Sequence, residues 1–136
     1  MKKIYLALVT LGVLLNVAVA DQTPLTRQSQ GEVTFVSGGV GEDERNTLQT
    51  MRADYNLSLL FTVKGTGEYL SDTKIRIEDQ HGVVWLETVA DGPMLFAKLK
   101  PGRYNVSATQ NGYQIYQKVL IGGKKSTALS FAWPQE

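Results

Sequence analysis

Apolar and polar residues alternate with a period of two along most of the chain after residue 54, which is the pattern of strands with one buried face. The segments "TKIRIED", "MLFAKL", "GRYNVSAT", "YQIYQKVLI" and "TALSFAW" follow this pattern, and turn-forming residues separate them at nearly even spacing. In "YNLSLLFTV" the predicted buried side consists of Tyr55, Leu57, Leu59, Phe61 and Val63. The pattern predicts an all-β antiparallel sandwich or barrel.

The residues before these strands predict a short helix and one further strand. Acidic residues open the segment 42–53 and basic residues follow, a charge order that stabilises a helix through its dipole. Leu48 and Met51, three residues apart, form its predicted buried stripe. Earlier in the chain, "EVTFVSGG" predicts a short strand over residues 33–36 that ends at the two glycines.

Residues 1–20 are predicted to be a signal peptide that is removed after Ala20. Lys2 and Lys3 open the segment, an apolar stretch follows, and Ala18-Val19-Ala20 has the small-x-small pattern that signal peptidase recognises. The alternative is an uncleaved anchor, but the stretch is borderline against the roughly 20 apolar residues of a membrane-spanning helix. No later segment is long or apolar enough to span. The sequence therefore predicts a periplasmic or secreted protein with no transmembrane segment after cleavage.

The charge and size expected for the exported chain argue against nucleic-acid binding. Removal of residues 1–20 takes away two lysines and no acids, which leaves 12 Lys and Arg against 13 Asp and Glu, a net charge of −1. A nucleic-acid binder needs a basic surplus gathered on one face. The remaining length suits one domain, expected over residues 32–136 after a polar, flexible leader at residues 21–31.

Three turns and the strands between them carry a resemblance to a known family. An Asp91-Gly92 turn is followed by "LKPGRY" over residues 99–104 and then by a Gly112-Tyr113 turn. This order resembles the carboxypeptidase regulatory-like domains, a prealbumin-like (transthyretin-like) family. The resemblance spans residues 55–131, and it implies an antiparallel seven-stranded β-sandwich with its core at about residues 55–133, preceded here by one short N-terminal helix. Pro101 and Gly102 are expected to form a tight type II-like turn.

The segment "GGVGEDERNTLQTMRADYNLSLLF" is similar to the front part of small secreted proteobacterial proteins that bear this domain. Most of those proteins are uncharacterised. The shared residues build turns and core, so the resemblance predicts a fold and implies no activity.

No catalytic or metal-binding constellation is found in the sequence. His81 is the only histidine, it lies in a predicted hairpin turn, and the chain has no cysteine, whereas a zinc site draws its ligands from Cys, His and carboxylates. The acidic run at residues 42–44 is explained by a helix start, and Asp72, Asp79 and Asp91 are explained by turns. Hydroxyisourate hydrolase, the enzyme of the prealbumin-like fold, relies on several histidines and a tyrosine-arginine-glycine-serine ending that this chain lacks. A protein without enzymatic activity, cofactor or metal is therefore expected.

Outward-facing apolar and aromatic residues are the candidate binding residues. Strand alternation predicts one outer patch that consists of Trp85, Met94, Phe96 and Tyr116. The predicted function is an interaction module that engages another envelope protein through a sheet face or an edge strand. The alternative is a carbohydrate-binding module in which Tyr69, Trp85 and Tyr116 stack on sugar rings. A third interpretation is that the helix at 42–53 or the N-terminal strand covers the patch.

Overall fold

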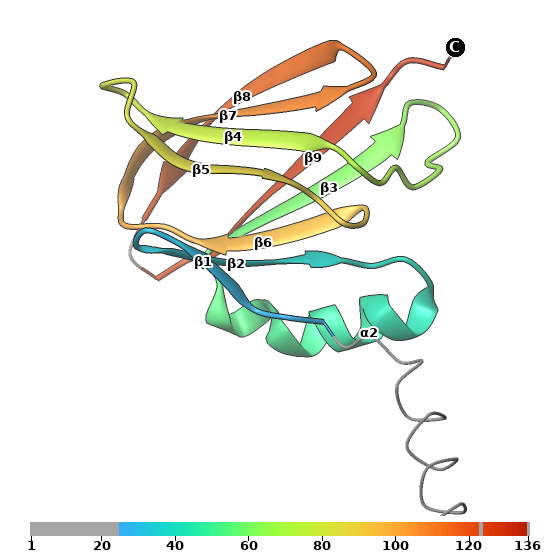
Figure 1. Ribbon diagram of the computed structural model, residues 1–136, viewed down its shortest axis with the longest axis horizontal. Coiled ribbons are helices and arrows are strands. Elements are labelled where there is room, and N and C mark those ends of the chain that lie inside the picture. Colours follow the sequence, from blue (N-terminus) through green and yellow to red (C-terminus); the bar gives the residue numbers. More distant parts are fainter. Residues whose placement is uncertain (1–24, 123, 136) are drawn as a thin grey trace, which may run out of the picture.

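The computed structural model describes residues 25–122 and 124–135 (Figure 1), so the predicted signal peptide, residues 1–20, lies outside the described part of the chain. Within that part the chain forms nine strands, one α-helix and one 3-10 turn. None of the helices in these residues has the length and apolar character needed to cross a membrane.

The strands form two sheets with the orders β1-β2-β6-β3-β9 and β5-β4-β7-β8. The five-stranded sheet consists of β1 (Gln28–Gln30), β2 (Val33–Gly38), β6 (Met94–Lys98), β3 (Leu57–Val63) and β9 (Thr127–Trp133). The four-stranded sheet consists of β5 (Val84–Val89), β4 (Lys74–Asp79), β7 (Gly102–Gln110) and β8 (Tyr113–Ile121). All neighbouring strands are antiparallel except β3 and β9, which run parallel. The chain crosses from one sheet to the other between β8 and β9.

The all-β prediction is confirmed, but nine strands are found in the described residues where seven were expected. The seven strands β3 to β9 lie between Leu57 and Trp133, while β1 and β2 extend the sheet beyond β6. The prediction of a flexible leader at residues 21–31 was wrong for Gln28–Gln30, which pair with β2. Polar residues can form such an edge strand because the backbone of the neighbouring strand supplies their hydrogen-bond partners.

The main core lies between the two sheets and takes residues from both. The predicted alternation is confirmed in β6, where Leu95 and Ala97 are buried in this core, and in β7, where Val106 and Ala108 are buried. The largest fully buried side chains of this core are Phe61, Phe131, Leu57, Leu59, Ile75, Ile77, Leu86, Leu95 and Ile121. Burial of these apolar side chains is the dominant force that holds the sheets together.

A second, smaller core lies on the outer side of the five-stranded sheet. The helix α2 (Glu42–Met51), continued by the 3-10 turn η2 (Arg52–Asp54), lies along this side in Figure 1. Its buried Leu48 packs with Val36, Tyr55 and Phe96, and Met51 is partly buried beside them. The predicted helix and its buried stripe are therefore confirmed.

Side chains close both seams where the edges of the two sheets meet. At one seam, the amide of Gln30 donates to the Glu87 carbonyl at 3.0 Å and accepts from the Glu87 N–H at 2.8 Å. At the other seam, Gln117 donates to the Ser130 carbonyl, and the indole of Trp133 donates to the Tyr113 carbonyl. These bonds occupy backbone groups of edge strands that would otherwise be free to pair with another chain.

The connection from β6 to β7 is held by two polar side chains. The Asn56 amide donates to the Leu99 carbonyl at 2.7 Å and accepts from the Leu99 N–H at 2.9 Å. The Tyr104 hydroxyl donates to the Lys100 carbonyl at 2.7 Å. The expectation of a type II-like turn was wrong, because Gly102 already belongs to β7 with φ 157°, whereas that turn needs a φ of about 80°.

Candidate functional site

The four residues predicted to form one outer patch are separated in the structure. Phe96 is 2% exposed beneath α2, and Met94 is partly buried in the same small core. Trp85 is half-buried against the main core. Tyr116 alone is widely exposed, at 68%, on the outer side of β8. The prediction of a common patch was wrong, and the interpretation that the helix covers it holds for the Phe96 part.

A β-bulge explains the position of Trp85. Ile77 of β4 pairs with Leu86, but the next residue, Glu78, pairs with Val84, so Trp85 is an extra residue on β5. The extra residue breaks the alternation that would have turned the indole outward. The ring instead meets the edge of the Tyr104 ring, with centroids 6.4 Å apart and planes at 85°.

The carboxylate of Asp79 organises the hairpin turn next to this bulge. Asp79 Oδ1 accepts hydrogen bonds from the backbone N–H groups of His81 and Val83, and Oδ2 accepts one from the Trp85 indole at 3.0 Å. The hydrogen bond from Trp85 is the largest cause that holds the pKa of Asp79 below its ordinary value of 3.8; desolvation opposes it, and the backbone bonds from Val83 and His81 add to the lowering. His81 is exposed in the turn and contributes its backbone N–H.

We expect this turn to lose stability on acidification. Because the folded chain keeps Asp79 charged more readily than the unfolded chain does, the carboxylate stabilises the fold above pH about 4, and this contribution disappears as the pH falls through the lowered folded pKa. Urea denaturation can be followed by tryptophan fluorescence. Between pH 5 and pH 2.5, the free energy of unfolding should fall less steeply for Asp79→Asn than for the wild type.

His81→Ala is the matched control, since it changes the same turn but leaves the three bonds to Asp79 in place. We expect it to change the pH profile far less than Asp79→Asn does, because the charge of His81 is the smallest of the causes that lower the pKa of Asp79. It should alter the free energy of unfolding by less than about 0.5 kcal/mol. An Asp79→Asn profile as steep as that of the wild type would contradict the role given to this carboxylate.

The outer side of the four-stranded sheet, here called the open face, is the candidate interaction surface. Tyr116 is 68% exposed and Leu120 is 63% exposed on β8, so no described residue covers this part of the sheet. The Tyr116 hydroxyl donates to the side chain of Gln114 at 2.8 Å. By strand pairing and burial, the open face consists of Lys74, Arg76, Glu78, Glu87, Val89, Arg103, Asn105, Ser107, Thr109, Gln114, Tyr116, Lys118 and Leu120.

Two shallow hollows lie on the open face. One, of about 490 Å³, is bordered by Lys74, Arg76, Glu87 and Gln114, and the other, of about 440 Å³, is bordered by Arg103, Asn105, Lys118 and Leu120. Arg76 is paired with Glu78 at 2.8 Å. The face thus combines apolar, aromatic and charged side chains of both signs. Sequence alternation identified Tyr116 correctly, but Leu120 was missed although its position in the same strand implied the same exposure.

The three aromatic residues predicted to stack on sugars are also apart. Tyr69 is 47% exposed in the connection from β3 to β4, and the guanidinium of Arg45 of α2 lies 4.9 Å from the centre of its ring. This contact places Tyr69 on the helix side of the sandwich, whereas Tyr116 belongs to the open face. A separate groove of about 600 Å³ at the end of the sandwich brings Tyr113 together with Leu70, Glu68 and Gln110.

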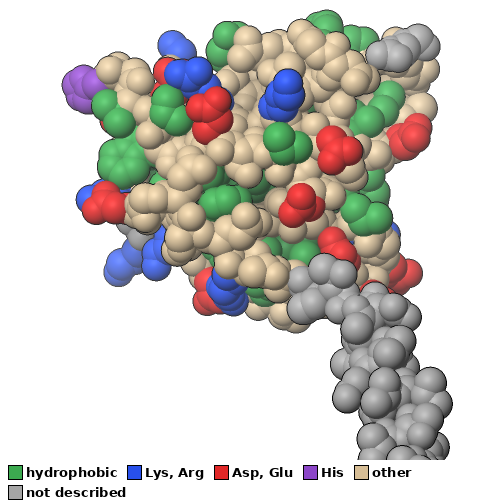
Figure 2. Space-filling model, in the orientation of Figure 1, with side chains coloured by type: hydrophobic (Ala, Val, Ile, Leu, Met, Phe, Trp, Pro, Cys, Tyr) green, Lys and Arg blue, Asp and Glu red, His purple; other side chains and the backbone are tan. Residues whose placement is uncertain are grey.

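Charged side chains are distributed unevenly over the molecule. On the side shown in Figure 2, Lys and Arg side chains lie mostly toward the left, whereas Asp and Glu side chains lie on both sides. Within the described residues, no group of three or more His, Cys, Asp or Glu side chains is placed to hold a metal ion.

Comparisons with protein-family models and with curated proteins find no match for this chain.

Proposed function

We propose that this chain is a non-enzymatic interaction module, exported to the periplasm or beyond it, that binds another envelope protein through the open face. The observation that carries the proposal is the exposure of Tyr116 and Leu120 on this face. On the corresponding side of the five-stranded sheet, α2 covers the part formed by β2 and β6, whereas no helix covers the open face. A sheet face that keeps an aromatic and an aliphatic side chain in water is suited to a partner.

The chemistry of the open face favours a protein as that partner. Tyrosine and arginine are enriched in protein interfaces, and Tyr116, Arg76 and Arg103 all belong to this face. Cations and anions lie side by side on this face: Arg76 forms an ion pair with Glu78 of its own strand, β4, and lies opposite Glu87 of the neighbouring strand, β5. Such an arrangement selects one orientation of a folded partner through complementary charges.

The proposed fold family is that of the carboxypeptidase regulatory-like, prealbumin-like domains. What supports it is the extent of the seven strands β3 to β9, which run from Leu57 to Trp133 over the residues where the sequence resemblance lies. Domains of one fold serve many functions, so this proposal adds no activity to the module.

A carbohydrate is the second candidate ligand, and the surroundings of Tyr116 are the observation in its favour. Neighbouring positions of β7 and β8 carry Thr109 and Gln114, which bring a hydroxyl and an amide group to the same side of the sheet as the ring. A tyrosine ring flanked by such groups is suited to stack on a sugar and to hydrogen-bond its hydroxyls.

The test compares a variant of the open face with a matched variant elsewhere. Tyr116→Ala with Leu120→Ser removes the apolar contacts of the face, and Tyr69→Ala removes another exposed tyrosine on the other side of the molecule. Both variants are expected to have a free energy of unfolding within about 0.5 kcal/mol of the wild-type value, since all three side chains are exposed.

Affinity capture from envelope extract, quantified by mass spectrometry, should enrich one protein with the wild type and with Tyr69→Ala, and lose it with the double variant. The captured protein, once purified, should bind the wild type directly. Equal capture by all three chains would overturn the role of the open face. Binding to a glycan array that depends on Tyr116, without protein capture, would replace the protein partner by a carbohydrate.

A further inference from the structure

A basic groove of about 780 Å³ lies on the helix side of the sandwich, away from the open face. It forms where η2 leads into β3, next to the end of β6 and the connection from β8 to β9. Each of these three elements brings one cation to the groove, namely Arg52 from η2, Lys98 from β6 and Lys124 from the connection. These residues are far apart in the sequence, and only the fold brings them to one place.

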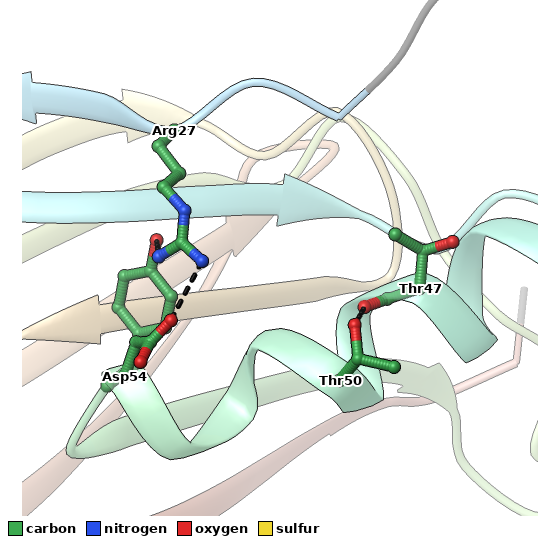
Figure 3. Close-up of polar contacts among 5 residues, drawn as sticks. Arg27, Thr47, Thr50 and Asp54 are labelled. Carbon is green, nitrogen blue, oxygen red and sulfur yellow. Dashed lines mark hydrogen bonds and ion pairs between the residues drawn. The ribbon is translucent and has the colours of Figure 1, made fainter.

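The three cations have no carboxylate partner among the described residues. The one acidic residue of the groove, Asp54, is already engaged, since its Oδ2 lies 2.8 Å from Arg27 Nη2 in an ion pair (Figure 3). Arg27 also donates to the Tyr55 hydroxyl at 3.2 Å. Arg27 therefore neutralises Asp54, and the charges of Arg52, Lys98 and Lys124 remain uncompensated.

Neutral groups complete the lining of the groove. The Gln49 amide and the Ser126 hydroxyl border it, and both side chains are exposed. Asn56 lies in its wall, where the paired hydrogen bonds to Leu99 hold the start of β3 against the end of β6. The groove thus combines three cations with hydrogen-bonding groups on a wall that is tied to the sandwich core.

We infer that this groove binds a phosphorylated ligand. A phosphoryl group concentrates up to two negative charges on oxygens that accept hydrogen bonds, so one group can engage several cations at once. The planar guanidinium of Arg52 matches two phosphoryl oxygens, and the two lysines act as point charges beside it. The size of the groove leaves room for a ligand larger than one phosphate, with a second anionic group to reach the third cation.

Inorganic pyrophosphate is the probe for the test, titrated into the purified chain and followed by calorimetry and by amide NMR shifts. Lys98→Gln with Lys124→Gln removes two cations of the groove while keeping side chains of similar length. Lys74→Gln with Lys118→Gln is the matched control, because it removes two exposed lysines from the open face. The groove variant should bind pyrophosphate about tenfold or more weakly, and the control should keep the wild-type affinity.

The amide shifts provide the location of binding. We expect them to concentrate at Arg52, Asn56 and Lys98 and to shrink as salt is raised, since exposed charges are screened. Equal weakening in both double variants, or equal affinity for citrate, would overturn the inference in favour of unspecific attraction. Absence of pyrophosphate binding by the wild type at low salt would also overturn it.

Vesicles distinguish the two sources of such a phosphoryl group. Binding to phosphatidylglycerol vesicles, lost in the groove variant and absent with phosphatidylcholine, would assign the groove to a lipid headgroup. Binding to pyrophosphate without binding to vesicles would assign it to a soluble phosphorylated ligand. The open face enters these experiments only through the control substitutions, and none of the readouts measures binding of a protein, so their outcome is independent of the proposed protein partner.

Discussion

Replacement of Gly92 by alanine is expected to destabilise the sandwich by at least about 3 kcal/mol, a large part of the stability of an ordinary domain. Gly92 lies buried in the connection from β5 to β6, directly against the backbone of Gly38 at the end of β2. A Cβ atom at Gly92 would overlap the Gly38 carbonyl group and come within 2.9 Å of the Gly38 Cα. Backbone atoms cannot rotate away as a flexible side chain can.

Hydrogen bonds prevent this connection from moving aside. The Asp91 N–H donates to the Ser37 hydroxyl at 3.0 Å, which ties the residue before Gly92 to the residue before Gly38. The change would therefore force the end of β2 and the start of β6 apart, although these two strands pair up to Gly38 and Met94.

Gly122→Ala is the control for this prediction, because among the described residues no atom beyond its chain neighbours lies within 4 Å of the Cβ position of that glycine. Urea denaturation followed by circular dichroism should show an unfolding free energy within about 0.5 kcal/mol of the wild type for Gly122→Ala and a large loss for Gly92→Ala. Wild-type stability in Gly92→Ala would mean that Gly92 and the backbone of Gly38 do not approach each other as closely as described.

Strand alternation predicted the buried faces wherever the strands are regular. Leu95 and Ala97 face the main core and Phe96 faces the helix, as a period of two requires. The helix at 42–53 was predictable because its apolar positions and charge order are local signals. The two inner faces and the one helix therefore follow from short-range sequence patterns.

Features that depend on pairing between strands were not predictable. Trp85 was placed on the outer side because alternation assumes an unbroken register, and the shift between Ile77 and Glu78 is a property of two strands together. The strand Gln28–Gln30 contains no apolar residue from which it could be predicted, because it is held by pairing with the backbone of β2. Parallel pairing of β9 with β3 likewise depends on where the chain crosses between the sheets.

The same reasoning separates the two candidate sites. Tyr116 of the open face could be predicted, because its exposure follows from its own strand. The basic groove could not, since Arg52, Lys98 and Lys124 come from three distant segments that each resemble an ordinary charged surface in the sequence. Its charge is apparent only when Asp54 is seen to be paired with Arg27.

Truncation of Phe96 to alanine is expected to cost about 3–5 kcal/mol, because the ring is 2% exposed and forms the centre of the small core beneath α2. Its ring lies 6.2 Å from that of Tyr55. We expect hydrogen exchange to accelerate more in the amides of α2 than in those of β7, because Phe96 belongs to the small core beneath α2 and not to the main core. Tyr116→Ala, an aromatic truncation at an exposed site, should leave both exchange rates unchanged.

The partner of Phe96 across this small core is Leu48, and their joint removal tests whether the helix is held by one cluster. Leu48→Ala alone should cost about 2–5 kcal/mol, and the double variant should lose less than the sum of the two single losses. Once either side chain is removed and the helix has loosened, the other has little packing left to lose. Strictly additive losses, or unchanged exchange of α2 in Phe96→Ala, would show that the helix is held by its polar ends, where Glu44 accepts from the Gly39 N–H at 2.7 Å.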